Sequence, residues 1–394
     1  MKKVLGLFIV LFVITGCGKK YDPYEVPEEV IIELNENVFR VYDEHKSQDL
    51  VKSSNVDITN NELIKTDELG KQTYTLTYKY NKREYKYDVV YEVIDDVPPT
   101  FIYSPLNINV VVGDDVIICD RIQFADNYDV DVECEITGDY DLNQIGTYEY
   151  DVTIRDSSGN ESYDHNNLNV LDELPASKPR VHNYVYMSDI MQFKNENTAI
   201  GIDVSRWQGN VDFKKVKDAG IEFVIMRMGY QKDEFDNYEK DIKFDEYYRQ
   251  AKEAGLDVSI YVYANSSTTE GAIKAANWII ENLNGDELDL PIAFDWEDWT
   301  DFNSYHMSLH TLSDCYLAFE KTLQDNGYDA MLYSSKYYLE HIWERYENSN
   351  VWLAQYYAEP TFEGDFILWQ MTDEGVIDGI TDNTVDIDIL YKKK

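Results

Sequence analysis

Asp295 and Glu297 are the two residues of this sequence whose types and spacing most directly indicate chemistry. They follow an apolar run, residues 290–294, of the kind that a strand buried on both faces shows. Residues two apart on a strand point to the same side, so the two carboxyl groups would project together and Trp296 would face away. Neighbouring carboxyls cannot both ionise freely, and the pKa of one tends to rise. A neutral carboxyl beside an ionised one is the pair that glycoside hydrolysis uses.

The same pair has a simpler interpretation, in which two solvated acids end a strand in an acidic chain. The surrounding sequence decides between the two interpretations. From about residue 197 onward, apolar strand-like runs alternate with amphipathic helical patterns, which indicates a parallel α/β arrangement. Eight strands are predicted, at residues 199–205, 221–228, 256–263, 290–296, 329–334, 351–356, 366–370 and 384–390. Helices are predicted at residues 213–219, 244–254, 269–283, 312–325 and, in a shorter form, near 338–346.

Eight strands with helices between the early ones predict a closed barrel, which is irregular because the late strands are too close in sequence to hold full helices. In such barrels the active site lies at the C-terminal ends of the strands. Asp203 lies near the end of the first strand, and Asp386 lies in the last, which adjoins the first on closure. Further candidates end the third, sixth and seventh strands: Tyr261, Tyr263, Gln355, Tyr356, Trp369 and Gln370. Carboxylates ringed by aromatic side chains suit a polyhydroxylated substrate with apolar ring faces.

Several of these residues also have structural interpretations. Asp203 could cap a turn, and one of Asp386 and Asp388 is expected to be structural, with Asp386 favoured for the site. Arg227, on a strand among apolar residues, is most simply a buried partner for one of the acids. Four tryptophans fit core or rim packing as well as they fit sugar platforms: Trp207, Trp296, Trp299 and Trp369.

The composition narrows the classes of function. The chain has 394 residues, with 35 Lys and Arg against 75 Asp and Glu, and a formal net charge of -40. This charge argues against a nucleic-acid partner, because phosphate binding needs a basic patch. No Cys or His spacing typical of a metal site occurs, and no cofactor is expected. Cys119 and Cys134 fall in one small region and could pair after export, whereas Cys315 fits a buried position in a helix.

The first residues have the pattern of an export signal. Lys2 and Lys3 precede an apolar run, residues 4–14, which is too short to span a bilayer as a helix. The ending Ile14-Thr15-Gly16-Cys17 resembles the lipobox of bacterial lipoproteins, in which cleavage falls before the Cys that carries the lipid. We therefore expect a signal peptide over residues 1–16, lipidation of Cys17, and a lipid-anchored location on the outer face of the cell membrane. The alternative is a plain secretory signal with cleavage nearby.

The chain between this signal and the barrel divides into four segments. Residues 17–27 are polar and contain prolines, which predicts a tether. Residues 28–172 are strand-like, with recurring turn signals, as in small all-β sandwiches. A weak internal repeat and the Pro98-Pro99 pair divide them into two domains, 28–96 and 97–172. Residues 173–196 lack sustained periodicity and form a linker, or an ordered strap along the last domain, residues 197–394.

The second β-rich domain contains residues 126–129 (DNYD), a strand that begins Gly146-Thr147-Tyr148, and the hairpin residues 156–160 (DSSGN). Together these resemble the immunoglobulin-like repeats of bacterial surface proteins, whereas the first domain lacks the hairpin. We interpret both domains as spacers. A wall-binding module is the alternative, and it would show a patch of exposed aromatic side chains.

Six short motifs occur in the last domain. They are residues 201–205 (GIDVS) with Gln208 and Gly209, 223–230 (FVIMRMGY), 295–297 (DWE), 351–356 (VWLAQY), 368–370 (LWQ) and 385–388 (VDID). In this order they resemble the glycoside hydrolase family 25 lysozymes, over roughly residues 197–391. The chain departs from the family pattern after Tyr261, where many members have a His, and at Asp388, which replaces a common Asn.

This resemblance implies a β-1,4-N-acetylmuramidase that cuts between N-acetylmuramic acid and N-acetylglucosamine in peptidoglycan glycan strands. It implies a TIM-like (β/α)5(β)3 barrel, with five βα units followed by three strands. It also implies that Glu297 is the general acid/base and that Asp295 is its partner, as a nucleophile or by orienting the 2-acetamido group. Asp203 and Asp386 would complete an acidic floor, and Tyr261 would help to stabilise the transition state. No metal is implied.

The leading hypothesis is therefore a lipid-anchored muramidase held off the membrane by two β-sandwich spacers. A non-catalytic peptidoglycan-binding surface lipoprotein on the same fold is the alternative, although the intact set of four acids argues against it. A third hypothesis is a structural surface protein whose stalk carries the function. Sequence spacing does not fix the distance between the two carboxyls, so retaining, inverting and substrate-assisted routes all stay open.

Overall fold

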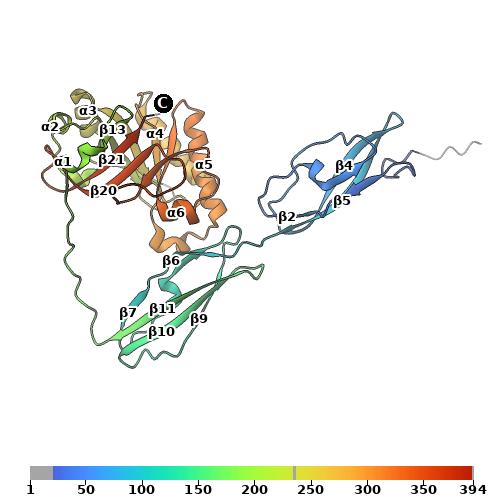
Figure 1. Cartoon of the computed structure of the whole chain (residues 1–394), viewed down its shortest axis with the longest axis horizontal. Helices are drawn as coiled ribbons and strands as arrows, with labels where there is room; N and C mark the ends of the chain where they lie inside the picture. Colours follow the sequence, from blue (N-terminus) through green and yellow to red (C-terminus); the bar gives the residue numbers. More distant parts are fainter. Residues whose placement is uncertain (1–20, 234–236, 393–394) are drawn as a thin grey trace, which may run out of the picture. The chain divides into compact units, whose positions relative to one another are not determined.

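The computed structural model of the chain describes residues 21–233 and 237–392, which fall into two compact units, Met1–Asp96 and Val97–Lys394 (Figure 1). The expected signal peptide, residues 1–16, and the expected lipidation site, Cys17, lie outside the described residues. Within those residues, every helix is too short or too polar to cross a lipid bilayer.

The first unit is built around a long antiparallel hairpin of β4 (Gly70–Tyr80) and β5 (Arg83–Ile94). The two turn residues, Asn81 and Lys82, both have positive φ, as a two-residue turn between right-twisted strands requires. Alternate side chains toward one end of each strand are buried, so one face packs on a small core. The unit is completed by β1 (Ile32–Leu34), β2 (Val38–Arg40), the 3-10 helix η1 (Ser47–Leu50) and β3 (Val51–Ser54).

The second unit begins with a β-rich module. Its four-stranded sheet has the order β7 (Asn107–Val111), β11 (Glu161–Leu171), β10 (Gly146–Arg155) and β9 (Glu133–Thr137). One face of this sheet buries its own hydrophobic core, which includes Tyr150 and Val152. A disulfide between Cys119 and Cys134 joins η2 (Ile118–Arg121) to β9. Two short strands, β6 (Thr100–Tyr103) and β8 (Gln123–Ala125), pair with each other apart from this sheet.

The rest of the second unit is a closed barrel of eight strands, and the sequence prediction of such a barrel is confirmed. Around the barrel the strands are β13 (Thr198–Val204), β14 (Phe223–Gln231), β16 (Asp257–Tyr263), β17 (Ile292–Asp295), β18 (Ala330–Ser335), β19 (Asn350–Ala354), β20 (Leu368–Val376) and β21 (Val385–Tyr391). The neighbours from β13 to β20 run parallel, whereas β21 is antiparallel to both β20 and β13. The short β15 (Tyr238–Lys240) extends the sheet beside the end of β14.

Helices cover the outside of the first five strands (Figure 1). They are α2 (Phe213–Asp218), α3 (Phe244–Ala254), α4 (Thr269–Leu283), α5 (Leu309–Gln324) and α6 (Lys336–His341), with the 3-10 segments η4 (Arg206–Gln208) and η5 (Trp299–Tyr305). Asp212 caps α2, because its carboxylate accepts a hydrogen bond from the N–H of Lys215 at 3.2 Å. Helix α5 begins three residues before the predicted start at residue 312, because Ser308 caps it by accepting from Thr311 N.

Alternate residues of each barrel strand face two different cores. Ile200, Ile202 and Val204 of β13 pack between the strands and the helices, whereas Ala199 faces the interior. Gly201 also belongs to the interior face, and a Cβ there would lie 2.1 Å from the ring of Phe223. The interior core is therefore filled at its base, and Asp203, two residues farther along β13, stands above it.

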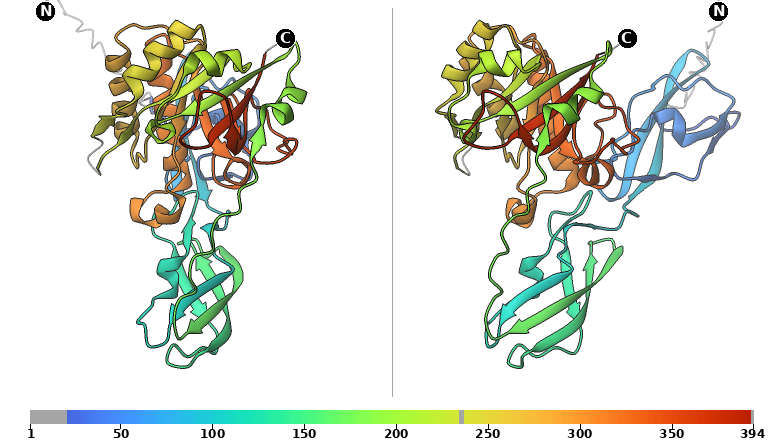
Figure 2. Two further views of the ribbon diagram at one scale, coloured as in Figure 1. Left: turned by 90° about the vertical axis from the view of Figure 1, so that its left-hand side faces the viewer. Right: turned by 60° about the vertical axis from the view of Figure 1, so that its left-hand side comes forward.

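An extended connection, residues 172–184, leads from β11 back to the barrel (Figure 2). It continues into β12 (Val185–Tyr186), α1 (Met187–Ile190) and η3 (Met191–Phe193) before the barrel begins. Strand β12 pairs in parallel with β20, so the barrel sheet gains an extra short strand on its outside edge.

The β-rich module contacts the barrel at η5, the segment that directly follows the Asp295–Glu297 stretch. Asn303 makes three of the hydrogen bonds across this junction. Its Oδ1 accepts from Phe124 N at 3.0 Å, its Nδ2 donates to Ile122 O at 3.1 Å, and its own N–H donates to Gln123 Oε1 at 2.8 Å. This junction fixes η5 from the side opposite to the barrel.

An Asn303→Ala variant is expected to lower the free energy of unfolding of the second unit by about 2 kcal/mol, because two side-chain hydrogen bonds are lost at about 1 kcal/mol each. Urea titration followed by tryptophan fluorescence measures this change. Asn326→Ala is the matched control, because the Nδ2 of Asn326 reaches only Thr322 O in its own helical end. Equal stabilities of the two variants would contradict a contribution of the junction.

Candidate active site

The four predicted acids come together at the C-terminal ends of the barrel strands. Asp295 is the last residue of β17, and Glu297 follows it at the mouth of the barrel. Asp203 and Asp386 are directly paired across β13 and β21. The carboxyls are close enough to repel one another, because Asp386 and Asp295 both raise the pKa of Asp203, and Glu297 raises that of Asp386. The sequence prediction of one acidic cluster thus agrees with the geometry.

Asp295 and Glu297 form a hydrogen-bonded carboxyl pair. Burial, followed by the charge of Glu297, raises the pKa of Asp295 well above its ordinary value, and Arg227 opposes the shift. Glu297 is exposed at the mouth of the barrel, and partial burial of its carboxyl raises its pKa as well. In such a pair the two carboxyls do not ionise independently of each other.

Asp203, Asp386 and Asp388 form the second group of acids. Burial and then the charge of Asp386 raise the pKa values of both Asp203 and Asp388 well above the ordinary range. Asp388 is completely buried and accepts a hydrogen bond from Trp352 Nε1 at 2.8 Å. Asp386 is only partly buried. This difference agrees with a structural role for Asp388 and with the placement of Asp386 in the site.

Gln370 connects these acids to the aromatic wall. Its Nε2 donates to Asp203 Oδ2 at 2.8 Å. Its Oε1 accepts from Tyr333 OH at 2.9 Å and from Tyr356 OH at 3.0 Å. Since Gln370 is itself buried, it fixes the orientation of the Asp203 carboxylate and holds both phenols in place.

Aromatic rings and a cavity adjoin the acids. Trp352 packs edge to face with Tyr333 and with Tyr261, at centroid distances of 4.6 and 6.3 Å. Burial raises the pKa of Tyr261 well above its ordinary value, and the charge of Asp203 adds to the shift. Tyr263 is the register partner of Asp295, and burial raises its pKa to about 12. Beside Glu297 lies a cavity of about 560 Å³, lined by residues that include Tyr333, Gln355, Tyr356 and Tyr357.

Two predicted substrate-binding residues have other roles. Trp369 is completely buried, its ring packs edge to face with Phe193, and its Nε1 donates to Gln355 O at 2.7 Å. The prediction that Trp369 contacts substrate is wrong, because this residue faces the outside of the barrel. The side chain of Gln355 lies at the cavity, but both of its polar atoms bond to Thr361, so it holds the loop after β19.

Other single-residue predictions have mixed outcomes. Arg227 is a buried cation as predicted, but its ion pair is with Asp241, at 2.6 Å between Nη2 and Oδ2, and not with one of the four acids. Trp296 and Trp299 are buried in an aromatic cluster with ring centroids 4.6 Å apart, so both are core residues. Trp207 is exposed and lies under the Arg206 guanidinium.

The sequence prediction missed Tyr333 and Trp352. Tyr333 follows the pattern used for the other strands, because it lies near the C-terminal end of β18 and is the register partner of Asp295. Trp352 gave no such signal, since it lies within β19 and reaches the acids only through Asp388. In the described part of the barrel, no three His, Cys, Asp or Glu ligand atoms approach one another closely enough to hold a metal ion.

The raised pKa of Asp386 predicts that the free energy of unfolding depends on pH. Burial, followed by the charge of Asp373, raises its pKa to about 7. The folded state therefore holds a proton that the unfolded chain releases near pH 4, and stability is lost as the pH rises from about 4 to about 7. In the Asp386→Asn variant, the decrease in the free energy of unfolding between these pH values should be smaller by on the order of 2–4 kcal/mol. Urea unfolding of both proteins between pH 4 and pH 8 measures it, and equal slopes would contradict the raised pKa.

The comparisons with known proteins agree with this geometry. Residues 202–380 match the family model described as Glycosyl hydrolases family 25. A protein named Autolytic lysozyme, from Clostridium acetobutylicum, is 28% identical over 192 residues, which is 48% of this chain and 54% of that protein. Lysozyme M1 of Streptomyces globisporus is 34% identical over 100 residues, which is 25% of this chain and 32% of that protein. The chain thus spans about half of the first relative and a third of the second.

A solved structure, that of a family 25 glycosyl hydrolase from Bacillus anthracis, is similar to 56% of this chain and 96% of that one, at 18% identity and a TM-score of 0.45. The match to the family model begins within β13 and ends before β21, so it lies entirely inside the barrel. The acids Asp203, Asp295 and Glu297 fall within the matched residues, whereas Asp386 follows them.

Proposed function

We propose that the barrel of this chain, a family 25 glycosyl hydrolase domain, hydrolyses the β-1,4 bond between N-acetylmuramic acid and N-acetylglucosamine in peptidoglycan. The observation that carries the proposal is the Asp295–Glu297 pair, hydrogen-bonded, with raised pKa values, at the mouth of an aromatic-lined cavity. A carboxyl that keeps its proton near neutral pH can protonate a leaving oxygen. Relatives named as lysozymes support the choice of substrate.

Glu297 is the general acid/base in this proposal, because its carboxyl is the one at the open mouth. Asp295 lies deeper, and its carboxyl serves either as a nucleophile or as the acceptor that orients the 2-acetamido group of the sugar. Asp203, held by Gln370, and Asp386 complete the group of acids beside the pair, and each adds negative charge there when it is ionised. An acidic floor of this kind stabilises the positive charge that develops on the sugar ring in the transition state.

The phenols around the acids have a separate role. Tyr261 is adjacent to Asp203 and Asp295, and its raised pKa keeps it neutral, so that its O–H can donate a hydrogen bond to a sugar oxygen or to a neighbouring carboxylate in the transition state. Tyr356 lies at the cavity wall, where its exposed ring can carry an apolar sugar face. Together these groups bind the glycan strand and position the bond that is cut next to the Glu297 carboxyl.

In this proposal, the rest of the chain holds the catalytic barrel at the outer face of the membrane. The (β/α)5(β)3 form of the barrel is supported by the five helices α2 to α6, each of which follows one of the first five strands. We further propose that the two β-rich domains are immunoglobulin-like spacers and that a lipid on Cys17 anchors the protein at the outer face of the membrane. The basis for the anchor is the sequence from Lys2 to Cys17.

A Cys17→Ala variant should move from the detergent phase to the aqueous phase on Triton X-114 partition, and unchanged partition would contradict the anchor.

Clearing of a peptidoglycan suspension tests the proposed activity. Residues 18–394 should lower the turbidity of purified, protein-free peptidoglycan, with release of soluble fragments. A protein that sediments with peptidoglycan of several wall types and releases nothing would contradict the proposal and favour a non-catalytic glycan-binding protein.

A further inference from the structure

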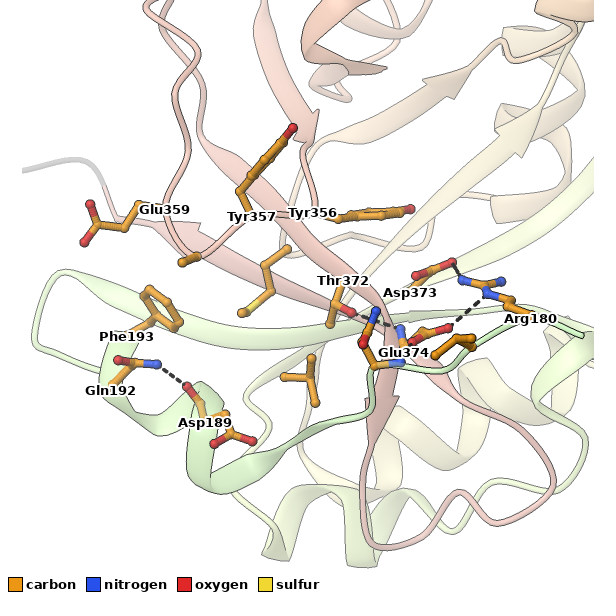
Figure 3. Close-up of a pocket in the computed structure, with 15 residues that line it drawn as sticks. Arg180, Asp189, Gln192, Phe193, Tyr356, Tyr357, Glu359, Thr372, Asp373 and Glu374 are labelled. Carbon is orange, nitrogen blue, oxygen red and sulfur yellow. Dashed lines mark hydrogen bonds and ion pairs between the residues drawn. The ribbon is translucent and has the colours of Figure 1, made fainter. Parts of the chain in front are cut away.

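A second cavity adjoins the catalytic one on the outside of the barrel. It has a volume of about 760 Å³ and lies between the strap, defined here as residues 180–193, the strand β20 and the loop after β19 (Figure 3). We call it the strap pocket. The strap precedes residue 202, where the match to the family model begins, so one wall of this pocket comes from outside the matched domain.

The strap is fixed to the barrel by several independent contacts. Val185 and Tyr186 pair with Gly375 and Val376 of β20. Arg180 bridges two acids of β20, with Nη2 at 2.6 Å from Asp373 Oδ2 and Nε at 3.0 Å from Glu374 Oε1. These contacts are visible as dashed lines in Figure 3. His182 and the backbone N–H of Asn183 also contact Glu374, which is buried. The strap pocket is therefore preformed.

Two tyrosines connect the strap pocket to the catalytic cavity. Tyr356 and Tyr357 line both cavities, and Glu297 lines the catalytic one. Tyr356 is fixed through its hydroxyl to Gln370, which also holds Asp203. The two residues are 50% and 66% exposed, so both rings are accessible to a ligand. A chain molecule that lies across these rings reaches from Glu297 into the strap pocket.

The side chains that line the strap pocket determine which kind of ligand it can bind. Met371, Val181 and the two tyrosine rings supply apolar surface, whereas Glu359 and Asp373 supply hydrogen-bond acceptors. The carboxylates of the lining outnumber the single guanidinium of Arg180, so an anionic ligand would be repelled. A neutral pyranose with hydroxyl and acetamido donors and an apolar ring face fits this combination.

We propose that the strap pocket is a distal glycan subsite that binds a neutral N-acetylated sugar, several units along the same strand from the bond that Glu297 cuts. This inference rests on the proposed function for the identity of the strand. It assigns to the strap a role in choosing long glycan strands over short fragments. A substrate that does not reach the strap pocket gains no affinity from it, so only long strands bind more tightly because of this subsite.

A Val181→Trp variant tests the subsite, because a bulky ring at this position fills the strap pocket. Val181 is 82% exposed, so the substitution does not disturb a core. The matched control is Ile242→Trp, at a 77% exposed position of the barrel that does not line the strap pocket. Rates are compared on long, peptide-free glycan strands and on a tetrasaccharide of the same repeat. We expect Val181→Trp to lower kcat/KM about tenfold on long strands through KM, and less than twofold on the tetrasaccharide.

Equal losses on the two substrates, or no loss on either, would overturn the subsite. A wild type that cuts neither substrate would instead overturn the proposed function. Binding separates the two cases, because the Glu297→Gln protein can bind long strands without turnover. Adding Val181→Trp to that protein should raise its Kd for long strands about tenfold, and an unchanged Kd would overturn the subsite whatever the outcome of the activity assay.

Discussion

Glu297→Gln is expected to lower kcat on peptidoglycan by about 10³-fold, with KM changed less than threefold. The size follows from general acid catalysis, which contributes about 10²–10⁴-fold. Glutamine preserves the shape of the side chain and its hydrogen bonding to Asp295, but it has no proton to give to the leaving oxygen. The measurement is the initial rate of release of reducing ends from purified peptidoglycan, at saturating and at limiting substrate.

Glu340→Gln is the matched control for this loss. Glu340 lines the same cavity as Glu297, but it pairs with Lys336 at 3.6 Å on the surface of α6. Its loss should change kcat less than twofold. If both variants retained full activity, Glu297 would not be the acid, and Asp295 would be the next candidate.

Asp295→Asn is expected to lower kcat by about 10²–10³-fold and, at the same time, to raise the thermal stability of the protein at pH 7. The loss of rate follows because an amide is not a nucleophile and cannot place negative charge beside the sugar. The gain in stability follows because burial raises the pKa of Asp295, so that its ionised form destabilises the fold at neutral pH. A neutral amide removes this cost.

The two effects of Asp295→Asn have opposite signs, which separates a catalytic from a structural role. Differential scanning calorimetry at pH 7 should show a Tm a few degrees above that of the wild type. The difference should shrink as the pH falls below about 4, the ordinary pKa of Asp, because the carboxyl then becomes protonated in the unfolded state as well. A fall in both activity and Tm would show that Asp295 supports the fold, and the proposed role would then be lost.

The acidic cluster could be predicted because it depends on rules that are local in sequence. Two-residue periodicity predicts that Asp295 and Glu297 project together, and the two carboxyls do interact, although β17 ends at Asp295 and Glu297 follows the strand. Closure of the barrel predicts that the first and last strands adjoin, and Asp203 is the register partner of Asp386. Both inferences use only strand geometry and order, without any detail of packing.

The assignment of Trp369 failed because two consecutive residues of one strand were both assigned to the site. The sequence predicted a strand over residues 366–370, which put Trp369 and Gln370 together at its end. Strand β20 runs from Leu368 to Val376, so the two residues lie within it and point to opposite faces. Gln370 therefore reaches Asp203 inside the barrel, whereas Trp369 packs against Phe193 outside.

The strap and the junction at Asn303 could not be predicted from periodicity. Residues 173–196, which include the strap, contain one strand of two residues, one α-helix of four and one 3-10 helix of three, all too short to produce a repeating pattern. The junction at η5 depends on Asn303 meeting three backbone or side-chain groups of residues 122–124, which are about 180 positions away in sequence. Contacts of this kind arise only when both surfaces are folded.

The most direct measurement of the central claim is the identity of the new reducing ends that the protein produces from purified peptidoglycan. The digest is reduced with borohydride, and the reduced sugar of each fragment is identified by mass spectrometry, with Glu297→Gln as the blank. The proposed function predicts muramitol at the new ends with the wild type alone. N-acetylglucosaminitol at those ends, or no new ends at all, would contradict it.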